Sequence, residues 1–244
     1  MYGPNTPGPG SGIIHLCLSH PVIIVAVLCV MLFINGVKSN DSVITICFDD
    51  GYESTYTKAF PILERHNFPA TINVITNSVG QGGYTSLDQL KELEKAGWEI
   101  GSHTISHPSL TEISTFKAFY EVYQSRRTLE SWKFDVNSFA VPYGDANDEV
   151  WELIEQEYEM SRGSEVGLNY KPFPHHQLRS IFPVADTKLE DVKEWIDRAV
   201  NEKAWLIITF HRIGETGKYN NSEEFLEKIC QYIENKGKVK VFRK

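Results

Sequence analysis

The sequence has few cysteines and no run of basic residues. Its four cysteines form no disulfide framework, because Cys17 and Cys29 lie in an apolar N-terminal stretch and Cys47 and Cys230 are far apart. Cys47 falls inside a strand-like run, where we expect a buried free thiol. Lys and Arg number 24 against 32 Asp and Glu, a formal net charge of −8. An acidic chain without a basic run argues against nucleic acid as a partner.

The first 40 residues lack acidic side chains altogether and contain one basic residue, Lys38. Residues 1–12 are rich in Pro and Gly, a composition typical of disorder. Residues 13–34 carry no formal charge, and their densest part, residues 22–34, has the length of a signal-peptide core and is short for a membrane span. The stretch before it has no Lys or Arg, so its orientation is poorly defined. We expect residues 1–40 to be a disordered segment plus a signal peptide or signal anchor. The protein would then be secreted, or anchored to a membrane through residues 13–34.

From residue 41 onward, strand-like and helix-like segments alternate, which predicts one α/β domain over residues 41–244. Repeated βα units imply a parallel sheet covered by helices, open or closed into a barrel. Capping boxes at Ser86 and Thr187 mark two helix starts, and residues 163–177 are a Pro-rich loop. We expect strands at residues 42–48, 70–75, 98–101, 138–141, 160–162, 178–181, 205–210 and 239–242. We expect helices at residues 54–66, 86–97, 114–132, 147–158, 187–201 and 222–235.

Two adjacent carboxylates stand at the end of the first strand. The apolar, β-branched run of residues 44–48 is followed by Asp49, Asp50 and Gly51. Successive side chains of a strand point to opposite faces, so the two aspartates can have different roles. One can hold a metal ion while the other moves a proton. On its own, Asp-Asp-Gly would be an ordinary solvated turn.

Two histidines, His103 and His107, follow the strand expected at residues 98–101, and Pro108 argues against a continuing helix. Two imidazoles at this spacing can converge on one cation. Together with a carboxylate they form a His-His-Asp set with open positions for water and substrate. Such a set suits zinc or another divalent metal, and the residues alone do not choose between them.

Three more candidates follow other strands. Pro142 and Tyr143 come after the strand expected at residues 138–141, and His211 follows residues 205–210. In parallel α/β proteins the C-terminal ends of the strands gather around one mouth, where ligands bind. We therefore expect these motifs to form one site. His211 could instead be a core histidine, but its place after an apolar strand and before Arg212 favours a catalytic role.

These motifs resemble those of the polysaccharide deacetylase family, the NodB-homology domains or family 4 carbohydrate esterases, over roughly residue 42 to the C-terminus. The resemblance implies a distorted, incomplete (β/α) barrel of about seven parallel strands. It also implies a hydrolase that removes N-acetyl groups from a cell-surface or extracellular amino-sugar polysaccharide, with Zn²⁺ or another divalent ion such as Co²⁺ as cofactor. The stretches that carry the resemblance are Cys47–Gly51, His103–His107, Phe139–Gly144 and Thr209–His211.

The resemblance implies a role for each candidate. The base would take a proton from the attacking water, the acid would protonate the departing amine, and a backbone N–H in the third motif would steady the oxyanion. By role, the metal ligands would be Asp50, His103 and His107, the catalytic base and acid Asp49 and His211, and the substrate-binding residues Pro142 and Tyr143.

The chain departs from the family pattern at two places. Ala140 stands where the family usually has an arginine that pairs with the base, although one branch reads F-A-x-P-Y-G as this chain does. Arg162, at the end of the next strand, is our candidate to orient the base and to complete the substrate site, with Arg179 second. The alternative is that Arg162 is a surface charge. The fourth motif, an aspartate with a tryptophan, is not visible, and the stand-ins are Asp186 and Asp191.

Two other functions stay open from the sequence. One is a degenerate barrel that binds glycan without turning it over, and the other is hydrolysis of a non-peptide C–N bond in a small molecule. The presence of Asp49 beside a complete metal set favours the enzyme, because a binding module has no need of a second carboxylate there. The sequence leaves the glycan, the native metal and the oligomeric state open.

Overall fold

The computed structural model describes residues 42–214, 216–237 and 239–241. The signal or anchor segment expected in residues 1–40 lies outside these ranges. Among the helices that the structure describes, none has both the length and the apolar character needed to cross a membrane.

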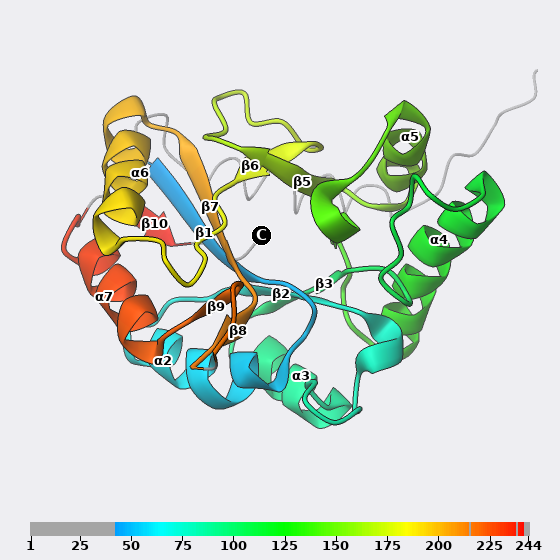
Figure 1. Ribbon diagram of the computed structural model, residues 1–244, viewed down its shortest axis with the longest axis horizontal. Coiled ribbons are helices and arrows are strands. Elements are labelled where there is room, and N and C mark those ends of the chain that lie inside the picture. Colours follow the sequence, from blue (N-terminus) through cyan, green and yellow to red (C-terminus); the bar gives the residue numbers. More distant parts are fainter. Residues whose placement is uncertain (1–41, 215, 238, 242–244) are drawn as a thin grey trace, which may run out of the picture. The chain divides into compact units, whose positions relative to one another are not determined.

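A sheet of parallel strands runs through the described part of the chain (Figure 1). The order of the strands is β10-β1-β2-β3-β4-β5-β6. β7 lies outside this order and also pairs with β1. Short β10 lies beside the start of β1, so seven strands, β1 to β7, make up the wall. The strands are β1 (Ser42–Phe48), β2 (Thr71–Val74), β3 (Glu99–Ser102), β4 (Ser138–Ala140), β5 (Met160–Val166), β6 (Leu178–Ser180), β7 (Trp205–Phe210) and β10 (Val239–Val241).

The wall curls into a distorted, incomplete barrel. β1 pairs with β7 along most of its length, whereas the segment after β6 meets β7 at one bridge, between Ile181 and Ile208. The pairing of β3 with β4 is equally short, a single position that joins Ser102 and Phe139. The expected α/β barrel of about seven parallel strands is therefore confirmed.

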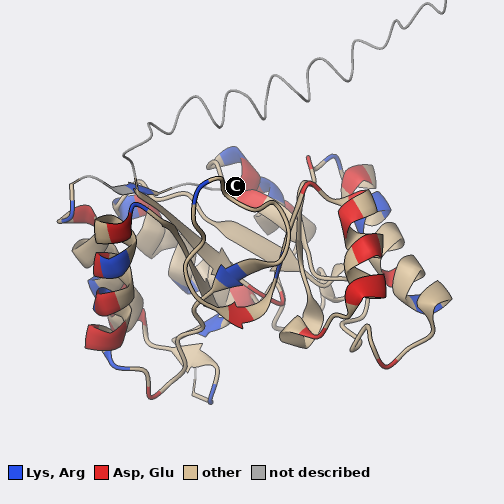
Figure 2. Ribbon diagram, turned by 90° about the horizontal axis from the view of Figure 1, so that it is seen from above, with Lys and Arg blue, Asp and Glu red and all other residues tan. Residues whose placement is uncertain are grey.

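Helices cover the outside of the wall (Figure 1). Their buried positions recur every three or four residues, as Val192, Ile196 and Ala199 do in α6. Many of the Asp and Glu residues belong to these outer helices (Figure 2). The helices are α2 (Phe60–Arg65), α3 (Leu87–Lys95), α4 (Thr115–Ser131), α5 (Asp148–Glu157), α6 (Leu189–Glu202) and α7 (Glu223–Glu234), with single turns η1 (Thr55–Ala59), η2 (Thr76–Ser78) and η3 (Pro142–Gly144).

One of the two expected capping boxes is present. The Ser86 side chain accepts from the backbone N–H of Gln89, and the Gln89 side chain accepts from the backbone N–H of Ser86. The capping box at Thr187 is wrong, because α6 begins at Leu189 without a side-chain cap. The Thr187 hydroxyl instead accepts from the backbone N–H of Val184 at 2.8 Å and closes the preceding turn.

The expected boundary at residue 162 is also wrong, because β5 continues to Val166 into the stretch taken as a loop. Its last three residues, Ser164–Val166, are exposed, so they carry no apolar pattern from which a strand could be predicted. A small two-stranded sheet, β8 (Arg212–Ile213) with β9 (Asn220–Asn221), was not expected at all.

β1 separates the helix-facing core from the barrel interior. Ile44, Ile46 and Phe48 belong to the apolar core under the helices, whereas Thr45 and Cys47 line a small cavity inside the barrel. Burial raises the pKa of the Cys47 thiol to about 12 and keeps the expected free thiol protonated. Alternation along β1 therefore sends the next odd-numbered side chain, at position 49, into the barrel interior.

Candidate active site

Asp50, His103 and His107 bring one ligand atom each together at the mouth of the barrel. Asp50 Oδ1 lies 3.4 Å from Nε2 of His103 and 3.4 Å from Nε2 of His107. The two Nε2 atoms are 3.1 Å apart. Within the part of the chain that the structure describes, this is the one cluster of His, Cys, Asp and Glu side chains that could hold a metal ion. Two imidazole nitrogens and a carboxylate oxygen form a donor set that suits zinc and leaves room for further ligands.

The environment of His103 fixes its orientation. Nδ1 donates to the carbonyl oxygen of Ala140 at 2.8 Å, so the lone pair of Nε2 faces the ligand position. Burial opposes the protonated form of His103, but its hydrogen bond to Asp50 and the charge of Asp49 raise its pKa. Burial and the neighbouring His103 lower the pKa of His107. Protons and a metal ion compete for the same atoms, so we expect the metal affinity to decrease as the pH decreases.

A buried glutamate of α4 holds the loop between the two histidines. Glu121 Oε2 accepts from the backbone N–H groups of Ile105 at 2.9 Å and Ser106 at 3.0 Å, and Oε1 accepts from the Ser106 hydroxyl at 2.6 Å. Thr104 and His107 both have positive φ, 67° and 61°, which costs a non-glycine residue about 1–2 kcal/mol. The hydrogen bonds to Glu121, with one from the His107 N–H to the Thr104 hydroxyl, offset that cost.

Asp49 lies inside the barrel and is held by two side chains. Arg162 Nη2 donates to both carboxylate oxygens, with 2.6 Å to Oδ2, and Asn73 Nδ2 donates to Oδ1 at 2.9 Å. All three residues are buried. Burial alone would raise the pKa of Asp49, but the charges of Arg162 and His103 hold it well below its usual range. Asp49 is therefore an ionised carboxylate in a fixed orientation.

Strand register explains how Arg162 reaches this carboxylate. Ala140 of β4 pairs directly with Arg162 of β5, so the guanidinium comes from the adjacent strand at the level of Ala140. Arg179, the other sequence candidate, forms an exposed ion pair with Glu165 at 2.7 Å instead. Sequence reasoning did not find Asn73, although an amide between Ile72 and Val74 of β2 was a visible signal.

The remaining candidates lie around the same mouth. His211 follows β7, with its ring 5.5 Å from that of Tyr219 between centroids. Tyr143 has a φ of 58°, and its ring packs edge-on against His107 at 4.6 Å. Pro142, beside it in η3, is buried beneath the surface. One cleft of about 820 Å³ is lined by Asp49, Asp50, His103, His107, Tyr143, Arg162 and His211.

The two stand-ins for the fourth motif lie elsewhere. Asp186 and Asp191 are both exposed, and neither lines the cleft. The structure thus brings together the base, acid and metal-ligand candidates but neither aspartate proposed to support His211.

The sequence from residue 36 to residue 160 matches the family model described as polysaccharide deacetylase, 125 of the 244 residues. The chain belongs to the polysaccharide deacetylase family.

Curated relatives match about half of the chain. It is 30% identical to the peptidoglycan-N-acetylglucosamine deacetylase of Bacillus cereus, over 49% of this chain and 55% of the relative. It is 32% identical to the poly-beta-1,6-N-acetyl-D-glucosamine N-deacetylase of Staphylococcus aureus, over 46% of this chain and 43% of the relative. The chain spans about half the length of the curated relatives it matches.

Solved structures share the fold. The Streptococcus pyogenes deacetylase PplD, solved in complex with acetate, matches with a TM-score of 0.56 and 25% identity, over 62% of this chain and 70% of that one.

Proposed function

We propose that this protein is a metal-dependent hydrolase that removes N-acetyl groups from an amino-sugar polysaccharide. The observation that carries the proposal is the position of Asp49, an ionised carboxylate fixed by Arg162 and directly next to the metal-ligand set. Relatives that are named as N-deacetylases of peptidoglycan and of poly-N-acetylglucosamine support the reaction class.

Asp50, His103 and His107 would hold the divalent ion, with zinc favoured and cobalt also suited. An ion bound there would lower the pKa of a water molecule and polarise the acetyl carbonyl.

The side chains around the ligand set would then carry the proton transfers. Asp49 takes a proton from the attacking water, and it is ready to do so because its carboxylate is ionised and oriented. His211, which lines the same cleft, gives a proton to the amine nitrogen as the C–N bond breaks. The backbone N–H of Tyr143 would donate to the oxyanion that forms when water adds to the carbonyl. The products are the free amino sugar and acetate.

We also propose that residues 41–244 form the catalytic domain and that residues 1–40 carry a signal or anchor that leads to an extracytoplasmic location. The support is the uncharged apolar run of residues 13–34 and the polysaccharide substrates named for the relatives.

The proposal is tested by acetate release from a panel of acetylated glycans. Activity should disappear with a chelator and return with zinc. His103→Ala should lose most bound metal and activity, whereas His175→Ala, which removes an exposed histidine outside the cleft, should change neither. A protein that binds metal and glycan but releases no acetate would be a glycan-binding domain, which would refute the hydrolase.

A further inference from the structure

The cleft around the metal-ligand set offers almost no free charge. Among the lining residues that the structure describes, the ones with an ionisable acid or basic side chain are Asp49, Asp50, Arg162 and three histidines. Asp49 and Arg162 neutralise each other, and Asp50 lies between two of the histidines. No other described lining residue is an Asp, Glu, Lys or Arg, so nothing there would pair with a charged group on a neighbouring sugar.

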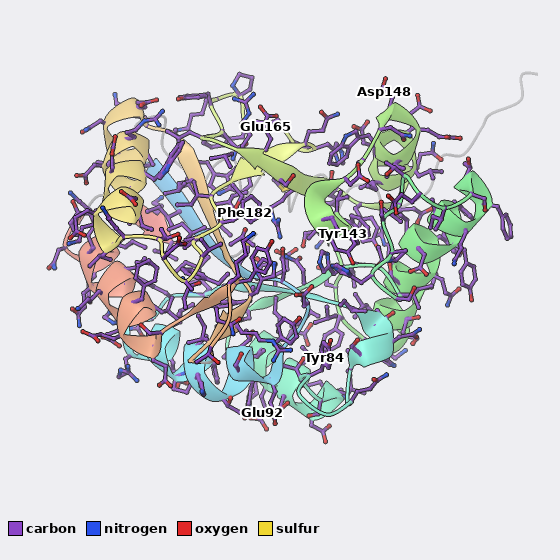
Figure 3. The ribbon with its side chains drawn as sticks, viewed as in Figure 1. Tyr84, Glu92, Tyr143, Asp148, Glu165 and Phe182 are labelled. Atoms are coloured by element: carbon purple, nitrogen blue, oxygen red, sulfur yellow. The ribbon has the colours of Figure 1, made fainter. Side chains whose placement is uncertain are left out.

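Aromatic rings supply much of the remaining wall. Tyr52 and Tyr84 stack at 5.2 Å between ring centroids, and their backbones form an antiparallel bridge that fixes the pair. Tyr143 and Tyr219 are 68% and 52% exposed, so a large part of each side chain is accessible to a ligand. Phe182 lines the cleft too, and Tyr84, Tyr143 and Phe182 come from three separate parts of the fold that border its centre (Figure 3).

Such walls select for uncharged sugar rings. The face of an aromatic ring carries partial negative charge, which attracts the weakly positive C–H groups on the face of a pyranose. A carboxylate pressed against the same rings would lose its water and meet no unpaired cation among the described residues that line the cleft, which is costly. We propose that the substrate crosses this cleft as an uncharged chain of N-acetylhexosamines, in which the sugars next to the reacting one pack on the aromatic walls. This inference rests on the proposed function and names its substrate class.

Two cations close to the wall could be thought to bind an acidic sugar. The Arg212 guanidinium lies 3.8 Å from the ring centroid of Tyr52, and Lys218 Nζ lies 5.1 Å from that of Tyr219. Both contact aromatic rings, and neither is among the residues that line the cleft. Their positions favour support of the two tyrosines over recognition of a substrate carboxylate.

The test measures acetate release by the purified, zinc-loaded full chain from three hexasaccharides. One contains N-acetylglucosamine alone, the second alternates it with N-acetylmuramic acid, and the third is the second with its carboxylates methyl-esterified. We expect kcat/KM for acetate release to be at least about tenfold higher on the uncharged hexasaccharide than on the acidic one. Esterification should recover most of the difference, because it removes the charge and keeps the bulk.

Variants test the aromatic residues and Lys218 one at a time. Tyr84→Ala should raise KM for the uncharged hexasaccharide about tenfold, because it removes a stacking surface. Phe116→Ala removes an exposed aromatic ring of α4 that does not line the cleft and should change nothing. Lys218→Gln should leave the ratio between the acidic and uncharged substrates as it is.

Equal or better turnover of the acidic hexasaccharide would overturn the inference and leave the proposed hydrolase intact. So would a Lys218→Gln variant whose activity falls on the acidic substrate alone. No acetate from any of the three substrates, with metal bound, would overturn the proposed function itself.

Discussion

Arg162 donates from Nη2 to both carboxylate oxygens of Asp49, a residue 113 positions earlier in the chain. The pair joins β5 to the C-terminal end of β1 inside the barrel, where both side chains are buried. Either charge alone would lose its ion-pair partner in the interior, and breaking a buried ion pair typically costs about 3–5 kcal/mol. The pair therefore fixes the proposed base and links two strands that are not neighbours in the sheet.

Arg162→Ala should lower kcat/KM by roughly 100-fold or more, because the base loses the group that orients it. Bound zinc should stay near one ion per chain, since the metal ligands are unchanged. Acetate release and metal content measure the two effects, and thermal unfolding reports the loss of the buried pair.

A second substitution separates a catalytic loss from a folding defect. Ala140 pairs in register with position 162, so Ala140→Arg in the Arg162→Ala background should place a guanidinium near Asp49 and recover part of the activity. Arg179→Ala removes an exposed arginine and is the matched control. Full activity in Arg162→Ala would remove this residue from the site.

The pH profile of the same variant should move in a definite direction. A general base works when deprotonated, so kcat/KM is lost as the pH falls through its pKa. Arg162 holds the pKa of Asp49 well below its usual range, so the parent should keep an ionised base to low pH. Without the guanidinium, burial raises that pKa, and the acidic limb should shift to higher pH. An unchanged limb, measured at saturating zinc, would mean that Asp49 does not set it.

The two adjacent aspartates should give opposite phenotypes. Asp49→Asn keeps the shape of the side chain but cannot accept a proton, so turnover should be abolished with zinc still bound. Asp50→Asn removes a charged ligand and should weaken zinc binding itself. Zinc affinity by competition with a chromogenic chelator distinguishes them, and swapped phenotypes would reverse the two assignments.

The sequence made much of this architecture predictable because the signals are local. A buried parallel strand is a continuous apolar run, and the chemistry follows directly at its C-terminal end, as Asp49 and Asp50 follow β1. Once the strands are placed, a parallel sheet brings their ends together, so His103, His107 and His211 were expected in one place. The structure shows them in one cleft.

The parts that were missed depend on contacts between distant segments. Asn73 lies in a short buried strand, and its role depends on the position of Asp49 at the end of the neighbouring strand. The exposed end of β5 has no apolar pattern, and the Thr187 hydroxyl bonds backward to Val184 where a capping box would bond forward. Sequence spacing alone does not decide between such local alternatives.

Glu121 is another residue that sequence reasoning missed. The signal for it was its place in the helical period of α4. The buried face of α4 consists of Ala118, Glu121, Val122, Ser125 and Leu129, so a carboxylate falls on a stripe that is otherwise apolar or small. A buried carboxylate requires partners, and here they are the loop atoms between the two candidate histidine ligands.

Glu121→Ala should therefore weaken zinc binding, by about 10–100-fold, although Glu121 contributes no ligand atom. Its loss leaves two backbone N–H groups without an acceptor and frees a loop with two positive-φ residues, so His103 and His107 no longer hold their positions.

Glu121→Gln keeps one acceptor oxygen and should have an intermediate affinity. Glu130→Ala removes a carboxylate from the same helix that pairs with Arg126 and Arg127, and it should bind zinc as the parent does. Weaker zinc binding could come from a general loss of stability or from a loosened ligand loop, and thermal unfolding with saturating zinc and with chelator separates the two. A general loss of stability lowers both unfolding midpoints equally, whereas a loosened loop reduces the difference between them. A Glu121→Ala protein with the zinc affinity of the parent would show that the loop holds its conformation without this carboxylate.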